Sequence, residues 1–372
     1  MQKVRGVDPK ISKRRRKGDM GSVKDLKVVK EPTADSLGIG RFTFSDRYSV
    51  FDWGEMPDQI PDKGTALAMM TGYNFFEMRK EAVESHFISM YSENRTDTDD
   101  FDIERPSDSM YVYLTQVLPT DNDYLEYQND YQHYLIPLEV IFRNGAPKGS
   151  SLFKRLEEAR GDQQKFDAVL DSMNLSKEPD PGDMFINPVY DFTTKLESTD
   201  RAITYNEAQQ MAGLDDWEFD KLLDLARLTN EFITQKAEAA GFEHFDGKIE
   251  AMYNKTEILL VDAVGTFDEN RFMYQDEQIS KEILRQAYKS FQPDWVKAAS
   301  EAKTEAAEKN DPDWKSYCDL QPKPLPEDFV TLMSNIYKSG ANKYIGSEVF
   351  SGAPSLNDLI PELRKQMEML SK

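Results

Sequence analysis

Apolar residues alternate with polar ones at the spacing of β-strands through much of the first third of the chain. Residues 23–29, 40–54 and 110–118 are rich in β-branched and aromatic side chains, and each of these segments predicts a strand. Residues 64–86 instead carry apolar side chains at helical spacing, which predicts a helix. The pattern therefore indicates a small, mainly antiparallel first lobe.

The rest of the chain changes to longer helical patterns around a few apolar strands. Residues 136–144 predict a buried strand, and residues 205–241 predict an amphipathic helix that stops at Gly241. Residues 244–272 predict a β-hairpin with its turn at residues 253–256. Further helical patterns lie at residues 279–291, 293–310, 325–344 and 355–370. We therefore expect the second lobe to be a sheet wrapped by helices.

Length and composition indicate a folded protein. Its 372 residues suffice for two domains of ordinary size, and 39% of them are hydrophobic. No run of about 18 apolar residues and no secretory signal pattern occurs, so we expect neither a membrane partner nor secretion. The single cysteine, Cys318, cannot form an internal disulfide, which favours a reducing compartment. These features predict a cytoplasmic protein.

Acidic residues dominate the charge of the chain. Its 67 Asp and Glu residues exceed its 46 Lys and Arg residues, which gives a formal net charge of −21. Nucleic acid is not expected as a partner, because phosphate backbones require a basic surface. The exception is a basic run at residues 13–17, which fits a nucleic-acid or targeting patch less well than a solvated tail.

The predicted hairpin gathers charge on one face. Because side chains of a strand alternate between faces, Asp246, Lys248 and Glu250 project together, and the next strand brings Asp262 close to them. Buried charges are costly unless something charged binds there. Carboxylates together with substrate phosphates are common ligands of Mg²⁺ in nucleotide enzymes. The spacing alone fits a magnesium site and a ladder of salt bridges equally well.

A polar loop follows the buried strand at residues 136–144. Arg143 and Asn144 end that strand, and a glycine- and serine-rich loop with Ser150 and Ser151 leads into a basic helix start. Backbone amides, hydroxyls and an arginine fork suit a phosphate or a carboxylate. Taken alone, however, the loop fits an ordinary turn with a surface arginine better than a binding site.

An ordered set of segments extends from about Gly21 to the 340s. They read GSVKDL, FSDRYSVFDWGEMPDQIPDKG, IPLEVIFRN with GSSLFKRL, NPVYDFTTKLESTDRAIT, the predicted hairpin, SKEILRQ and LPEDFVTLMSNIYKSGANKY. In this order they resemble the phosphoribosylaminoimidazole-succinocarboxamide synthase (SAICAR synthase) family of purine biosynthesis. The resemblance implies an α+β, two-lobed, SAICAR-synthase-like or ATP-grasp-like fold, with antiparallel sheets and extra C-terminal helices.

The same resemblance implies an ATP-dependent ligase. Such an enzyme joins the carboxylate of an aminoimidazole ribonucleotide (CAIR) to L-aspartate through an acyl phosphate, and it gives SAICAR, ADP and phosphate. Phosphorylation is needed because a carboxylate is a poor acyl donor, so the site must hold Mg-ATP beside it and screen the gathered negative charge. The expected cofactors are therefore ATP and Mg²⁺, and a homo-oligomer is left open.

The resemblance also assigns roles to individual residues. The predicted catalytic residues are Asp246, Lys248 and Arg271. The residues predicted to bind the nucleotide are Gly21, Ser22, Val23, Lys24, Glu250 and Asp262, of which Glu250 and Asp262 would also hold Mg²⁺. The residues predicted to bind substrate are Ser45, Arg47, Lys63, Arg143, Ser150, Ser151 and Arg271. The adenine is expected near residues 110–115.

Three departures from the family pattern leave alternatives open. Ser22 stands where the family usually has lysine, Ala263 replaces an acid, and Phe267 replaces a proline. The chain could therefore be a ligase for a different carboxylate, or a nucleotide-binding relative without catalysis. His244, beside the charged strand, is expected to be structural rather than a general base.

We expect three regions along the chain. They are a basic tail at residues 1–19, an ATP-binding lobe at residues 20–115, and a C-terminal lobe at residues 116–372 that carries the metal, ATP and CAIR sites. The tyrosine-rich insertion at residues 119–135 and the last helix fit either a subunit interface or solvated decoration.

Overall fold

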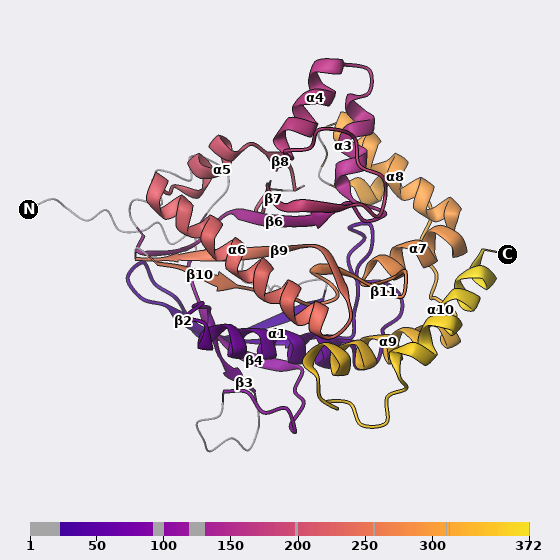
Figure 1. The fold of residues 1–372 in the computed structure, drawn as a ribbon, viewed down its shortest axis with the longest axis horizontal. Helices are drawn as coiled ribbons and strands as arrows, with labels where there is room; N and C mark the ends of the chain where they lie inside the picture. The colour runs from indigo at the N-terminus through magenta and orange to yellow at the C-terminus, as the bar shows by residue number, and fades with distance from the viewer. Residues whose placement is uncertain are drawn as a thin grey trace, which may run out of the picture.

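Two sheets with helices packed on them organise the chain, as the ribbon in Figure 1 shows. The structure is a computed structural model. It describes residues 23–91, 100–118, 131–197, 200–255, 257–309, 311 and 313–371. The basic tail, the predicted nucleotide-binding residues Gly21 and Ser22, and most of the tyrosine-rich insertion lie outside these residues. The mixture of helices and antiparallel sheets confirms the predicted fold class.

The first sheet is four-stranded and antiparallel, in the order β1-β2-β4-β3. Strands β1, β2 and β4 and the helix that packs against the sheet agree with the predicted elements of this part of the chain, whereas β3 was not predicted. These elements are β1 (Lys24–Lys30), β2 (Gly38–Phe44), α1 (Lys63–Lys80), β3 (Phe87–Met90) and β4 (Ser109–Leu114).

The strand predicted over residues 40–54 is shorter than expected, because it ends at Phe44. After it, Phe51 and Asp52 adopt positive φ angles of 54° and 56°, which turn the chain. The apolar residues of this loop, including Tyr48 and Trp53, are buried in the core. Their near-alternation therefore reflects loop packing rather than strand geometry.

The second sheet is eight-stranded, and its longest strand, β9 (Glu243–Asn254), lies at the centre. The first half of β9 pairs with β11 and β6, and its second half pairs with β10 and β5. The other strands are β5 (His133–Leu135), β6 (Leu138–Gly145), β7 (Met184–Thr194), β8 (Ala202–Ile203), β10 (Glu257–Val261), β11 (Asn270–Tyr274) and β12 (Glu277–Ile279). The predicted hairpin of β9 and β10 is confirmed.

The segment at residues 205–241 forms two helices instead of one. Helix α5 (Tyr205–Ala212) ends at Gly213, whose φ of 65° suits glycine better than other residues. Helix α6 (Asp216–Ala239) then starts with a capping box, in which Asp215 and Glu218 each bind the other's backbone N–H. Helix α6 packs across β6, β9 and β10 and buries one face of the second sheet.

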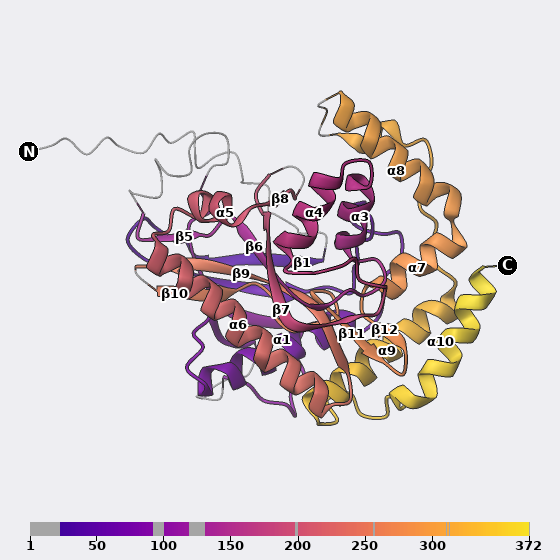
Figure 2. The same cartoon turned by 45° about the horizontal axis from the view of Figure 1, so that its top comes forward.

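The remaining helices form two groups. Helices α3 (Ser151–Ala159) and α4 (Gln163–Ser172) pack against each other beside β7. The C-terminal group arches along one side of the molecule, as Figure 2 shows. It consists of α7 (Glu282–Phe291), α8 (Pro293–Glu308), the 3₁₀ turn η2 (Trp314–Tyr317), α9 (Glu327–Ile345) and α10 (Leu356–Leu370).

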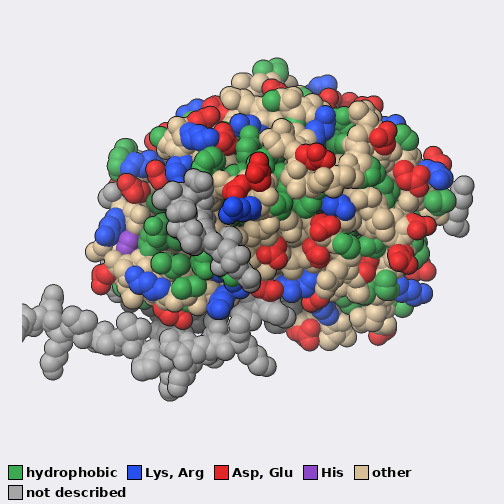
Figure 3. Space-filling model, turned by 90° about the horizontal axis from the view of Figure 1, so that it is seen from below, with side chains coloured by type: hydrophobic (Ala, Val, Ile, Leu, Met, Phe, Trp, Pro, Cys, Tyr) green, Lys and Arg blue, Asp and Glu red, His purple; other side chains and the backbone are tan. Residues whose placement is uncertain are grey.

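The C-terminal helices belong to the core. Helix α9 packs on α1, and α10 packs on both α9 and α7. Residues such as Leu359 and Ile360 of α10 are buried, so the last helix is not the solvated decoration considered above. No helix among the described residues has the length and apolar character that crossing a membrane requires. Figure 3 shows acidic and basic side chains interspersed on the face seen from below.

Candidate active site

The charged face of β9 forms the centre of the site. Arg143 of β6 pairs with Asp246, and Ile141 pairs with Lys248, which fixes the register of the two strands. On the other side of β9, Val261 of β10 lies opposite Glu250. The register therefore places Asp262 next to Glu250, as the alternation of the sequence predicted.

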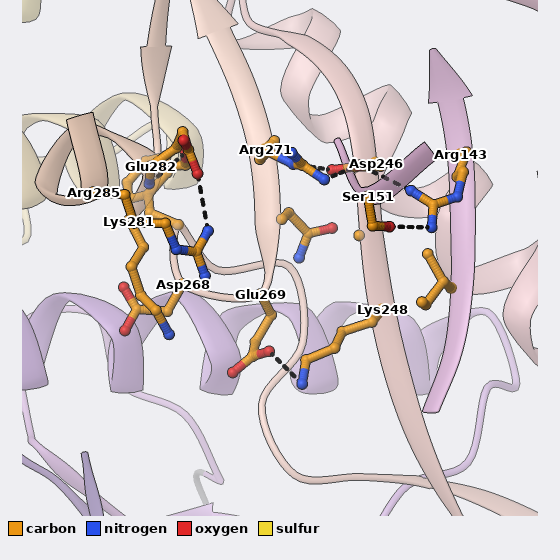
Figure 4. Close-up of a pocket in the computed structure, with 15 residues that line it drawn as sticks. Arg143, Ser151, Asp246, Lys248, Asp268, Glu269, Arg271, Lys281, Glu282 and Arg285 are labelled. Carbon is orange, nitrogen blue, oxygen red and sulfur yellow. Dashed lines mark hydrogen bonds and ion pairs between the residues drawn. The ribbon is translucent and has the colours of Figure 1, made fainter. Parts of the chain in front are cut away.

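A pocket of about 190 Å³ opens beside the first half of β9. Its wall combines five cationic and four acidic side chains with polar and apolar ones. The lining residues are Ile141, Arg143, Ser151, Asp246, Gly247, Lys248, Phe267, Asp268, Glu269, Asn270, Arg271, Ser280, Lys281, Glu282 and Arg285. Figure 4 shows β9 and β11 contributing one side and the start of α7 the other. The predicted catalytic residues Asp246, Lys248 and Arg271 all line it.

Two arginines meet at Asp246. The Nε and Nη2 atoms of Arg271 donate to the two carboxylate oxygens of Asp246 at 2.8 and 2.6 Å, a bidentate pair. Arg143 Nη1 approaches the same carboxylate at 3.8 Å from the neighbouring strand. Because Arg143 and Asp246 are almost fully buried, this pairing fixes the directions of both guanidinium groups at the pocket.

Ser150 and Ser151 have different roles at the pocket. Ser150 is buried, caps α3 by accepting from the Leu152 N–H, and accepts a hydrogen bond from Arg143 at 3.3 Å. Ser151 accepts from Arg143 at 3.1 Å and lines the pocket. The hydroxyl that a ligand can reach is therefore that of Ser151, whereas Ser150 supports the loop.

A chain of alternating charges connects the pocket to Glu250. Lys195, directly after β7, lies 2.7 Å from Glu250 and 3.1 Å from Glu139. Lys248 also contacts Glu139, and it lies 3.3 Å from Glu269 at the pocket. Burial would lower the pKa values of both lysines, but the surrounding carboxylates raise them above the ordinary lysine range. Both lysines therefore stay charged at neutral pH.

Asp262 and Lys24 form an ion pair between the two sheets. Burial would raise the pKa of Asp262, but Lys24 and two further lysines hold it well below its usual range. Glu250 behaves in the opposite way, because burial and the nearby charge of Asp262 raise its pKa to about 7. The two neighbouring carboxylates therefore repel each other despite their lysine partners.

The pair Glu250 and Asp262 fits a hard divalent cation. Within the described part of the chain, Oε1 of Glu250 accepts no hydrogen bond of good geometry, although Lys195 Nζ lies nearby. A cation here would also relieve the repulsion between the two carboxylates. No group of three or more acidic, histidine or cysteine side chains suited to a metal gathers among the described residues. Substrate oxygens would therefore have to complete the coordination.

The predicted residues from the segments around the first sheet do not line the pocket. The carbonyl of Val23 accepts from the N–H and the hydroxyl of Ser45, at 3.0 and 2.8 Å. Arg47 Nη2 lies 2.6 Å from Asp25. Lys63 is fully buried, and its Nζ lies 2.8 Å from Asp268, which lines the pocket. Lys63 thus reaches the pocket only through Asp268.

His244 has the structural place expected for it. It is buried under the sheet, where Thr234 Oγ1 lies 2.8 Å from Nδ1 and Asn270 Oδ1 lies 3.0 Å from Nε2. Burial lowers the pKa of His244 to about 4, so it is neutral at physiological pH. Ala263 and Phe267, which depart from the family pattern, are both buried in the apolar core.

A small apolar cluster lies where the two sheets meet. Four of its members, Leu135, Met252, Leu259 and Val261, lie in strands of the second sheet, and the fifth, Leu37, directly precedes β2 of the first sheet. A backbone hydrogen bond of 2.8 Å from the Leu135 N–H to Gln116 ties this cluster to the segment after β4.

Several residues of the site were not predicted. Glu139, Lys195, Asp268, Glu269, Lys281 and Arg285 all belong to the pocket wall or the charge chain. Lys195 and Lys281 lie inside segments that carry the family resemblance, so the segments gave a signal for them. Glu139 also lies inside such a segment, IPLEVIFRN, but its contact with the two lysines depends on strand pairing that the sequence does not show.

Comparisons with known proteins agree with one another. A family profile described as SAICAR synthetase matches residues 21–302. The chain is 38% identical over 351 residues to a putative phosphoribosylaminoimidazole-succinocarboxamide synthase of Archaeoglobus fulgidus, covering 94% of this chain and 100% of the relative. It is 29% identical over 317 residues to the phosphoribosylaminoimidazole-succinocarboxamide synthase of Thermoplasma acidophilum, covering 82% and 93%.

Solved structures show the same fold. SAICAR synthase from Saccharomyces cerevisiae complexed with SAICAR matches with a TM-score of 0.56 and 21% identity, covering 88% of this chain and 94% of that one. A SAICAR synthetase in complex with ADP matches with a TM-score of 0.50 and 20% identity, covering 71% and 88%.

Proposed function

The chain belongs to the SAICAR synthetase family, and we propose that its charged pocket joins the carboxylate of CAIR to the amine of L-aspartate at the expense of ATP. The family consists of ATP-dependent ligases of purine biosynthesis, and the products are SAICAR, ADP and phosphate. One observation carries the proposal for this chain. The charged face of β9 runs without interruption from the pocket at Asp246 to the carboxylate pair of Glu250 and Asp262.

CAIR is proposed to bind at the β6 and β9 side of the pocket. Arg143, Arg271 and the hydroxyl of Ser151 converge there, and guanidinium forks suit its phosphate and carboxylate. Asp246 uses both oxygens to accept from Arg271, so its role is to orient that arginine rather than to take up a proton. A fixed arginine lowers the cost of ordering the site when the substrate arrives.

L-aspartate is proposed to bind at the opposite wall, at the start of α7. Ser280, Lys281 and Arg285 line that wall and offer two cations for a dicarboxylate. Burial lowers the pKa of Lys281, which makes a charged partner from the substrate more favourable. The two walls face each other across one pocket, so the amine and the carboxylate can meet in it.

ATP is proposed to lie between the sheets, with Lys24 at its phosphates and Glu250 and Asp262 holding Mg²⁺. When bound there, Mg²⁺ would neutralise part of the phosphate charge. The adenine is proposed to lie near residues 110–115, beside the apolar cluster of Leu135, Met252 and Val261, which the Leu135 N–H to Gln116 hydrogen bond joins to the segment after β4. The division into lobes at residues 115 and 116 also stays a proposal. It agrees with the change of sheet between β4 and β5.

The lysines of the charge chain suit the chemistry of this reaction. A carboxylate that attacks a phosphate brings several negative charges together, and preorganised cations stabilise that arrangement. Lys195 and Lys248 both remain charged and lie between the proposed nucleotide and the pocket. We therefore add Lys195 to the residues proposed to act in the reaction.

Release of ADP by the purified protein tests the proposed function. It should require CAIR, L-aspartate and magnesium together, and SAICAR should appear in equal amount. Release with aspartate and some other carboxylate, but not with CAIR, would point to a different ligase. Nucleotide binding without turnover of any carboxylate and amine mixture would point to a binding protein instead.

A further inference from the structure

Helix α9 contacts the floor of the pocket, although it lies beyond the residues 21–302 that the family profile matches. The floor is the segment 267–271, and all five of its residues line the pocket. The N–H of Lys281 donates to the carbonyl of Phe267 at 2.9 Å, which joins the floor to the start of α7. Whatever fixes this segment therefore fixes Asn270 and Arg271 as well.

The first contact of α9 with the floor is made through Asp268. The Tyr337 hydroxyl donates to Oδ1 of Asp268 at 2.8 Å, and Lys63 Nζ lies 2.8 Å from Oδ2. All three side chains are almost completely buried. Burial would raise the pKa of Asp268, but Lys63, Lys281 and the Tyr337 hydroxyl hold it at about 2. Oδ1 of this carboxylate therefore accepts a hydrogen bond from Tyr337, and Oδ2 forms an ion pair with Lys63, although Oδ2 accepts no hydrogen bond of good geometry from the described residues.

The second contact lies one turn further along the same face of α9. Gly340 packs against the ring of Phe267, and a Cβ atom at position 340 would come within 2.6 Å of that ring. Tyr337 and Gly340 thus touch two consecutive residues of the floor. A helix that meets a segment at two adjacent points restrains both its position and its orientation.

We infer that Tyr337 is a positioning residue of the active site, which acts through Asp268 to hold the pocket floor and Arg271 in the geometry that binds substrate. Helix α9 then belongs to the binding apparatus as well as to the core. The inference rests on the proposed function for the identity of the substrate, CAIR, but not for the geometry. The reaction's chemical steps do not involve Tyr337 directly, because its hydroxyl points to Asp268 and not into the pocket.

The substitution Tyr337→Phe tests this role, because it removes one hydroxyl and keeps the ring. The KM for CAIR should rise about tenfold, the size expected for losing one hydrogen bond to a charged group, while kcat changes by less than about twofold. Tyr344→Phe is a matched control. Tyr344 is a buried tyrosine of the same helix, and its hydroxyl donates to Asn74 at 3.1 Å, away from the pocket.

Hydrogen exchange gives a second measurement that does not depend on turnover. Amide protons of residues 267–271 and of Lys281 should exchange faster in Tyr337→Phe, and in Gly340→Ala, than in Tyr344→Phe. Equal exchange and equal KM values in Tyr337→Phe and Tyr344→Phe would overturn the inference. If the unmodified protein fails to turn over CAIR and aspartate, the proposed function is wrong, and the exchange rates still decide whether α9 positions the floor.

Discussion

Lys195 Nζ lies 2.7 Å from Oε1 of Glu250, although the strands that carry these residues are not neighbours in the sheet. Strand β6 separates them, and its Glu139 contacts both Lys195 and Lys248. The backbone N–H of Lys195 also donates to Pro137 at 3.0 Å, which fixes the lysine at the end of β7. Glu250, the proposed metal ligand, is therefore linked to the pocket residue Lys248 through Lys195 and Glu139, and Glu139 lies on the strand between β7 and β9.

Replacing Lys195 by methionine should reduce kcat about 100-fold to 1,000-fold, because a preorganised cation is lost where negative charge gathers. The rate of ADP release at saturating substrates measures this effect. Lys236→Met is a suitable control, because both lysine side chains are 29% exposed and Lys236 contacts Glu77, Tyr73 and the Phe232 ring, none of which lines the pocket. Equal rates in the two variants would remove Lys195 from the proposed reaction.

Substituting the carboxylate pair should abolish the response to magnesium. Glu250→Gln and Asp262→Asn each remove one proposed ligand, so turnover should fall at least about 100-fold at any magnesium concentration. Mn²⁺ should also bind more weakly to the complex of each variant with nucleotide than to that of the unmodified protein. The paramagnetic relaxation caused by bound Mn²⁺ measures this binding. Glu257→Gln on the same hairpin is an exposed control. Full activity in both Glu250→Gln and Asp262→Asn would contradict the metal assignment.

Arg271→Lys should weaken the binding of CAIR while leaving that of ATP unchanged. Lysine cannot reproduce the bidentate contact with Asp246, so the cation would lose its fixed direction. We expect the KM for CAIR to rise about tenfold to 100-fold. Arg364→Lys is the control, because Arg364 binds Glu277 and a backbone carbonyl outside the pocket. Similar KM values in the two variants would exclude Arg271 from the substrate site.

Stability should fall as pH drops from about 6.5 to 4, because His244 is buried in its neutral form. Its pKa is lowered from 6.5 to about 4, so the unfolded chain binds the proton more readily throughout this range. The stabilisation is complete above pH 6.5 and is lost on acidification. A shift of this size corresponds to about 3 kcal/mol, at roughly 1.4 kcal/mol per pKa unit.

Urea unfolding of the protein and of His244→Gln, at several pH values, measures this contribution as the difference between the two. His86, whose pKa burial also lowers to about 4, is present in both and therefore cancels. The difference in the free energy of unfolding should shrink towards pH 4. A difference that stays constant with pH would show that His244 does not titrate in this way.

The sequence predicts correctly those site residues that lie on a single strand or next to it. Alternation along β9 placed Asp246, Lys248 and Glu250 together, and the short turn to β10 added Asp262. The end of α6 and the helices α7 to α10 could also be predicted from the sequence, because the spacing of their apolar residues and the signals at their ends are local. This local periodicity is visible in the sequence and does not depend on how the helices and strands pack in three dimensions.

Contacts between distant segments could not be predicted in the same way. The role of Glu139 depends on which strands flank β6, and the sequence does not state the strand order. The choice between Ser150 and Ser151 depends on where α3 begins, since the residue at its cap turns inward. The alternation after Phe44 predicts a strand, but the chain forms a loop there, because buried residues in a loop can alternate by chance.

Asp268 of the pocket floor contacts Lys63 from the first part of the chain and Tyr337 from its last part. A chain that emerges from the ribosome can form the first sheet and α1 early, because their contacts are local in sequence. It cannot fix Asp268 until α9 has been synthesised. Ligand-binding competence should therefore arise last in biosynthesis, after most of the secondary structure, and it depends on nearly the full length of the polypeptide.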